Sequence, residues 1–133
     1  MIPYGRQDIS QEDINAVVDV LKSDFLTQGP VVERFECALA NYSGASYVAA
    51  VNSATSALHI ACLALGVGAQ DIVWTSPISF VASANCALYC GAEVDFVDID
   101  SATYNMSASA LEEKLIKAEK LGRLPKVVIP VHL

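Results

Sequence analysis

The sequence lacks the features that define several broad classes of protein. No window of eighteen consecutive apolar residues occurs among its 133 residues, so no membrane-spanning helix is expected. The amino terminus has neither the basic start nor the apolar core of a secretory signal peptide. A net charge of −7 argues against nucleic acid held by bulk electrostatics, although a small anion at a helix end remains compatible with it. We therefore expect no membrane partner and no nucleic-acid partner.

Short catalytic motifs are also missing. There is no GxGxxG, Walker A, HExxH or GxSxG pattern, which removes the sequence support for a Rossmann dinucleotide site, a P-loop, a zinc peptidase and an α/β-hydrolase. The cysteines form no CxxC pair, and Cys86 and Cys90, which would share a helix face, have no nearby histidine. Buried free thiols are therefore predicted instead of a metal site, and unpaired thiols fit a reducing cytoplasm. The four cysteines are Cys37, Cys62, Cys86 and Cys90.

The composition indicates a folded chain. Hydrophobic residues make up 53% and charged residues 17%, and the length suits one domain or part of one. Two amphipathic helices are predicted first. Ser10 opens one of them, with Asp13 three residues later as in a capping box, and the other lies between Gly29-Pro30 and Gly44.

Apolar strands alternate with helices from Tyr47 onward. Strands are predicted near residues 47–51, 72–76, 93–97 and 126–131, and helices near 53–65, 80–89 and 109–121. This alternation indicates βαβ units and an α/β fold with a largely parallel sheet flanked by helices. We divide the chain into leading helices at 1–44 and βαβ units at 45–133. Because a complete α/β domain usually covers its last strand with another helix, we interpret residues 1–133 as part of a domain, ending in mid-fold.

The turn at residues 52–56 is the first candidate site. Small and hydroxylated residues follow a predicted strand and open a helix, where the first backbone N–H groups have no partner inside the helix. Those groups, the helix dipole and a hydroxyl of Ser53, Thr55 or Ser56 could hold a phosphate. The alternative is an ordinary helix cap made by Ser53 or Asn52.

Ligands of parallel sheets lie at the carboxyl ends of the strands. That rule places residues 52–56, 76–80, 98–100 and His132 at one edge of the predicted sheet. Phe80, at the start of the next helix, could stack on a flat heterocycle there, or it could be an apolar plug of the core.

The remaining polar candidates have simpler interpretations. The spacing of Asp95, Asp98 and Asp100 resembles that of paired carboxylates for acid–base chemistry or a metal. However, Asp95 alternates with the others about a predicted strand, and Asp98 and Asp100 fall in the turn after it, so turn-forming and capping roles are favoured. His59 lies on an apolar helix face, which favours a packed side chain over a catalyst. Arg6 and Arg34 could hold anionic groups or be surface charges.

Several motifs in order resemble the pyridoxal-phosphate (PLP)-dependent sugar aminotransferases of the DegT/DnrJ/EryC1/StrS family. The resemblance spans nearly the whole chain, and residues 2–7 and 86–100 are closest to a branch that acts in pseudaminic acid synthesis. The matching segments are Gln28-Gly29-Pro30, Phe35-Glu36, Val51–Leu58, Ser76–Asn85, Asp98-Ile99-Asp100 and Ile129–Leu133.

The resemblance implies a type I aminotransferase fold, of which this chain would be the amino-terminal part of the large, PLP-binding domain. It implies that Ala54 and Thr55 hold the cofactor phosphate, that Phe80 stacks on the pyridine ring, and that residues 27–29 lie near the sugar-nucleotide site. It also implies homodimers with active sites at the subunit interface, a cytoplasmic location, and amino transfer from glutamate to a 4-keto UDP-sugar.

Three departures from the family pattern qualify this expectation. The Glu-Asp-Ala-Ala/Cys-His stretch, whose aspartate pairs with the pyridine nitrogen, and the Schiff-base lysine before Gly-Glu-Gly-Gly are both absent from these residues. The third is minor: Gln70-Asp71 stands where relatives usually have Gly-Asp.

The chain's own lysines do not replace the missing one. Lys22, Lys114, Lys117 and Lys120 are expected on polar helix faces, and Lys126 at the far end of the sheet from the candidate site. We therefore assign no catalytic residue and expect no transamination by these residues alone. The alternative is a non-catalytic binding or oligomerisation module derived from the same domain. A well-behaved oligomer in size-exclusion chromatography would favour that module.

Overall fold

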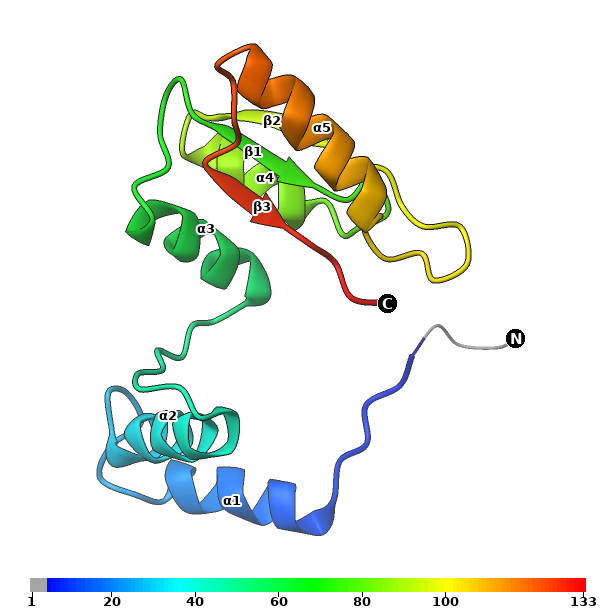
Figure 1. The fold of residues 1–133 in the computed structure, drawn as a ribbon. Helices are drawn as coiled ribbons and strands as arrows, with labels where there is room; N and C mark the ends of the chain where they lie inside the picture. Colours follow the sequence, from blue (N-terminus) through cyan, green and yellow to red (C-terminus); the bar gives the residue numbers. More distant parts are fainter. Residues whose placement is uncertain (1–4) are drawn as a thin grey trace. The chain divides into compact units, whose positions relative to one another are not determined.

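The computed structural model describes residues 5–133 and divides the chain into two compact units (Figure 1). The first unit extends to Ala50 and the second covers Val51–Leu133, so the division falls a few residues after the predicted boundary at 44/45. Within the segment 2–7 singled out above, residues 2–4 lie outside the part that the structure describes.

The first unit contains two helices whose ends confirm the sequence signals. Helix α1 (Gln11–Leu21) begins after Ser10, whose hydroxyl accepts a hydrogen bond from the Asp13 N–H at 3.2 Å, while the Asp13 carboxylate accepts one from the Ser10 N–H at 2.8 Å. This is the predicted capping box. Helix α2 (Pro30–Ser43) begins after Gly29 and is followed by Gly44 in the left-handed conformation, with φ of +73°. Capping residues next to each helix thus determine where these two helices begin or end.

The strand predicted at residues 47–51 is wrong. This segment has no regular structure, Tyr47 is 93% exposed, and the Ala50 N–H donates to the Glu36 carboxylate at 2.7 Å. A strand requires a backbone partner, and in the described chain the strands pair only with one another. An apolar run can therefore match a buried strand in composition and still lack the pairing that makes one.

The second unit is a three-stranded parallel sheet with helices on both faces (Figure 1). The strand order is β2-β1-β3, with β1 pairing β2 from Ile72↔Glu93 and β3 from Val73↔Val127. The predicted largely parallel α/β sheet is confirmed in this unit. Its elements are α3 (Ala54–Ala64), β1 (Ile72–Thr75), α4 (Ala82–Tyr89), β2 (Glu93–Phe96), α5 (Ala108–Lys120) and β3 (Val127–Ile129).

Two neighbouring residues of β1 define the two halves of the core. Val73, fully buried, packs with Cys62 of α3 and Cys86 of α4, whereas Trp74 packs with Val97 and with Ala118 of α5. Successive side chains of a strand point to opposite faces, so α3 and α4 cover one face of the sheet and α5 covers the other. The ends of all three strands consequently meet at one carboxyl edge, where loops to α4 and α5 begin.

Replacing Gln70 by glycine is expected to stabilise the second unit. Gln70 has φ of +76°, a left-handed conformation that strains a residue with a Cβ atom but not glycine. We expect a gain of about 0.5–1 kcal/mol, because the relief of strain exceeds the added chain entropy. Thermal unfolding followed by circular dichroism measures it. Ala69→Gly, at the adjacent position without positive φ, is the matched control and should destabilise; an equal loss for both variants would contradict the prediction.

Candidate functional site

The amino-terminal end of α3 carries a serine cap and two open amides. The Ser53 hydroxyl accepts from the Ser56 N–H at 3.2 Å, and the Ser53 carbonyl accepts from the Ala57 N–H at 3.0 Å. The amides of Ala54 and Thr55 have no hydrogen-bond partner among residues 5–133. The two interpretations of this turn are therefore compatible, because the cap uses the Ser56 amide and leaves two donors for an anion.

Hydroxyl groups at the same turn are not equally available. Ser56 Oγ donates to Asn52 Oδ1 at 2.7 Å, and it lies 3.1 Å from Ser53 Oγ. Both serine hydroxyls are thus engaged within the cap. The Thr55 hydroxyl has no partner in the part of the chain that the structure describes. Of the three hydroxyls that the sequence offered for an anion, Thr55 is the one left open.

Phe80 does not plug the core. Its side chain is 74% exposed, and it lies in the loop before α4, since that helix begins at Ala82 with Val81 as its cap and not at residue 80 as predicted. The chain enters α4 through a tight turn, in which the Phe80 carbonyl accepts a hydrogen bond from the Ser83 N–H at 3.0 Å. An exposed ring at the carboxyl edge of the sheet is available to a flat ligand.

Helix direction brings these groups to the same edge. Helix α4 connects parallel neighbours β1 and β2, so it runs opposite to them and begins at their carboxyl ends. Helix α3 packs on α4 and begins on the side toward which the β1 arrow points (Figure 1). The loop 76–80, the open amides of α3 and the ends of the strands therefore lie along one edge, as predicted. Ser76, at the end of β1, is buried, and its hydroxyl lacks a partner within residues 5–133.

Asp98 and Asp100 form turns, as the sequence favoured. The Asp98 carboxylate accepts from the Ile99 N–H at 2.8 Å. Asp100 Oδ1 accepts from the amides of Thr103 and Ala102 and from the Thr103 hydroxyl. The backbone hydrogen bond from Thr103, its side-chain hydrogen bond and the Ala102 amide lower the pKa of Asp100. These carboxylates are engaged in building the loop after β2.

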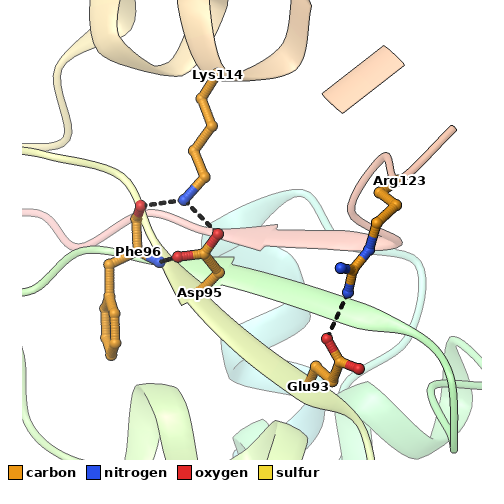
Figure 2. Close-up of polar contacts among 5 residues, drawn as sticks. All are labelled: Glu93, Asp95, Phe96, Lys114 and Arg123. Carbon is orange, nitrogen blue, oxygen red and sulfur yellow. Dashed lines mark hydrogen bonds and ion pairs between the residues drawn. The ribbon is translucent and has the colours of Figure 1, made fainter. Parts of the chain in front are cut away.

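Asp95 lies on β2, as predicted, and belongs to an ion-pair cluster between β2 and α5 (Figure 2). Lys114 Nζ lies 2.7 Å from the Asp95 carboxylate, donates to the Phe96 carbonyl, and sits 4.7 Å from the centre of the Trp74 ring. Burial alone would raise the pKa of Asp95, but the hydrogen bonds from Lys114 and Phe96 and the nearby cations outweigh it, so the pKa is lowered. Lys114 is therefore not on a purely polar helix face, contrary to the sequence prediction.

The lysine at the start of β3 lies away from the candidate site. Lys126 Nζ pairs with the Asp71 carboxylate at 2.9 Å and donates to the Gly66 carbonyl at 2.6 Å. Gly66 and Asp71 both precede β1, so Lys126 lies at the amino ends of the strands. The sequence prediction for this lysine is confirmed.

Among the remaining candidates, one side chain is packed, one is exposed, and the others lie in the first unit. His59 packs edge-on against Tyr89, with ring centres 5.3 Å apart, which confirms a packed histidine between α3 and α4. His132 is exposed. Arg6, Arg34 and the 27–29 loop belong to the first unit, and there Gln28 adopts a left-handed φ of +53°.

The cysteines are all free, but not all are buried. Cys62 and Cys86 are buried and Cys90 is partly so, whereas Cys37 of α2 is exposed, contrary to expectation. Burial, with a smaller contribution from Cys86, raises the pKa of Cys62 to about 11. In residues 5–133 no group of three or more histidine, cysteine or acidic side chains could hold a metal ion. Nor does any helix in that range have the length and apolar character to cross a membrane.

The class of protein follows from this arrangement and from structural comparison. A DegT/DnrJ/EryC1/StrS aminotransferase of known structure from Brucella abortus superimposes with a TM-score of 0.81 at 35% identity, over 88% of this chain and 32% of that one. A Streptococcus pneumoniae protein solved in a PMP-form gives 0.83 at 31% identity, over 97% and 31%. The fold is that of part of the α/β domain of the PLP-dependent aminotransferases.

Sequence comparison assigns the chain to a family within this class. The DegT/DnrJ/EryC1/StrS aminotransferase family matches residues 7–133, and the chain belongs to that family. A Campylobacter jejuni relative named UDP-4-amino-4,6-dideoxy-N-acetyl-beta-L-altrosamine transaminase is 46% identical over 117 residues, which is 88% of this chain and 31% of the relative. A Bacillus subtilis spore coat polysaccharide biosynthesis protein is 39% identical over 98% and 32%. The chain spans about a third of the length of these relatives.

Proposed function

We propose that residues 1–133 are the amino-terminal part of the PLP-binding domain of a nucleotide-sugar aminotransferase. Ala54 and Thr55 would hold the cofactor phosphate, and Phe80 would stack on its ring. The observation that carries this proposal is the pair of unpartnered amides at the amino-terminal end of α3, at the carboxyl edge of the sheet. Two amides, a free hydroxyl and a helix dipole fit a phosphate, and the exposed Phe80 ring fits a flat heterocycle.

The substrate follows from the family and the branch. The Campylobacter relative's name supports a UDP-linked amino sugar as the substrate. Pseudaminic acid synthesis, glutamate as amino donor, a dimeric assembly and a cytoplasmic location are proposed from the family resemblance alone. PLP, when bound, supplies an electron-accepting ring for amino transfer. This chain's contribution is to bind the phosphate and fix the plane of that ring.

We further propose that residues 1–133 do not transaminate by themselves. The reaction requires a lysine that moves a proton at the bound ring. Lys114 is engaged by Asp95, the Phe96 carbonyl and Trp74, and Lys126 lies at the amino ends of the strands. Lys22 caps α1 in the first unit, and Lys117 and Lys120 are exposed on α5.

A non-catalytic binding or oligomerisation module is the second candidate. It is favoured by exposed apolar side chains on the first unit, where Phe25, Leu26 and Phe35 are each more than half exposed. Such surface is typical of an interface between chains.

Titration of the ¹⁵N-labelled chain with PLP tests the first proposal. We expect saturable shifts of the Ala54 and Thr55 amide signals, because those N–H groups receive the phosphate. Phe80→Ala should weaken binding by about tenfold through loss of ring stacking. Leu88→Ala, an exposed apolar residue near the other end of α4, is the control and should leave the affinity unchanged.

Borohydride reduction followed by intact mass completes this experiment. Scattered labelling of surface lysines is expected. Shifts that fail to saturate would contradict the phosphate site. A single stoichiometric adduct at one lysine would show that the chain does hold the cofactor as an imine and that our exclusion of its lysines is wrong.

A further inference from the structure

The loop before α4 contains a short series of hydrogen bonds that ends on the backbone of Phe80. Ser83 Oγ and Ser79 Oγ are 2.6 Å apart, and Ser79 Oγ donates to the Phe80 carbonyl at 3.2 Å. The Ser83 N–H donates to the same carbonyl at 3.0 Å. The Phe80 carbonyl therefore accepts two hydrogen bonds, both from the residues that form this hydroxyl pair.

The orientation of the hydroxyl protons follows from the partners. Ser79 has one proton, and directing it to the Phe80 carbonyl leaves its oxygen as the acceptor for the Ser83 hydroxyl. The resulting order is Ser83 to Ser79 to Phe80, in which both hydroxyls donate. Ser83 is only 8% exposed and lies in the first turn of α4, so this series begins at a buried position of that helix.

The ring and the backbone of Phe80 differ in how firmly the structure holds them. The residue is 74% exposed, so its ring has little packing to hold it, whereas its carbonyl accepts two hydrogen bonds. A stacking residue with a free ring would lose conformational entropy on binding, and fixing its backbone beforehand lowers that cost. The hydrogen bonds of the hydroxyl pair thus fix the conformation of Phe80, which packing alone does not.

We propose that Ser79 and Ser83 are positioning residues that hold Phe80 in place for the ring of the bound cofactor. The inference rests on the proposed function, since it requires that Phe80 stack on that ring. The phosphate is held by different groups, at the amino-terminal end of α3. Binding of phosphate alone should therefore not depend on the serine pair.

Two probes separate these contributions in the ¹⁵N-labelled chain: PLP and inorganic phosphate, each followed through the Ala54 and Thr55 amides. Ser79→Ala should weaken PLP binding by about fivefold, the value of one lost hydrogen bond, and leave phosphate binding unchanged. Ser79→Thr keeps the hydroxyl and should restore PLP binding. Ser109→Ala is the matched control and should leave PLP binding unchanged, because it removes one hydroxyl of a different serine pair, 3.0 Å from Ser107 Oγ, and leaves the Ser107 cap of α5 intact.

The outcomes distinguish this inference from the proposed function. Equal PLP affinity for Ser79→Ala and the parent chain would overturn the positioning role, as would an equal loss of PLP and phosphate binding. PLP affinity that never exceeds that of phosphate would overturn both the stacking by Phe80 and this inference. Failure of either probe to shift the Ala54 and Thr55 amides would overturn the phosphate site itself, and with it the positioning role that depends on it.

Discussion

Replacing Thr55 by aspartate is expected to abolish PLP binding while leaving α3 as stable as before or more so. The new carboxylate would stand beside the two open amides, where the cofactor phosphate has to lie. Repulsion between neighbouring negative charges near a protein surface is worth several kcal/mol, so we expect the affinity to fall by at least about a hundredfold. The same charge at the positive end of a helix dipole is favourable by about 0.3–1 kcal/mol.

Opposite effects on binding and stability make this variant diagnostic. The serine cap should persist, because the Ser53 hydroxyl and the Ser56 amide are not altered. Thr55→Val is the uncharged control: it replaces the hydroxyl by a methyl group of similar size and should weaken binding by about fivefold. Affinity is measured by the Ala54 amide shift and stability by thermal unfolding. If Thr55→Asp bound PLP as tightly as the parent chain, the phosphate would have to lie elsewhere.

Helix ends and the parallel βαβ arrangement were predicted from local sequence patterns, whereas the particular partners of segment 47–51 and of Lys114 were not. The Ser10–Asp13 capping box and the glycine ends of α2 follow from residues a few positions apart, and the structure has them. The segment 47–51 is apolar enough for a strand, but pairing depends on a neighbour far along the chain. Composition alone carries no information about that neighbour.

The same distinction between local and long-range features holds for the candidate site. Small residues before an apolar helix predicted the open end of α3 correctly, since cap geometry is local. The sequence left Phe80 open as stacking residue or core plug, and only packing showed its exposure. Ser79 and Ser83 were missed as a pair, although a spacing of four residues around an aromatic residue was visible. The Lys114–Asp95 pair joins α5 to β2 and had no signal in sequence spacing.

Replacing Trp74 by alanine is expected to unfold most of the second unit. Trp74 is the largest fully buried side chain in the described chain and packs with Val97 and Ala118 beneath Lys114. Truncating a buried tryptophan costs about 3–5 kcal/mol, from lost contacts and from the cavity left behind. That loss is comparable to the whole stability of a small domain, which is often about 5 kcal/mol.

The matched variants show which interaction of Trp74 matters. Trp74→Phe keeps an aromatic ring and should retain a cooperative transition, whereas Trp74→Ala should lower the melting temperature by about 15 °C or more, measured by circular dichroism. Lys114→Met removes the cation above the ring but keeps an apolar stem over it, and should cost only about 1–2 kcal/mol. Because Trp74 faces α5, and α3 lies on the opposite face of the sheet, the fraction of Trp74→Ala that stays folded should still bind phosphate at Ala54 and Thr55. A melting temperature within a few degrees of the parent chain would mean that the α5 face contributes little to stability and that the α3–α4 face alone maintains the sheet.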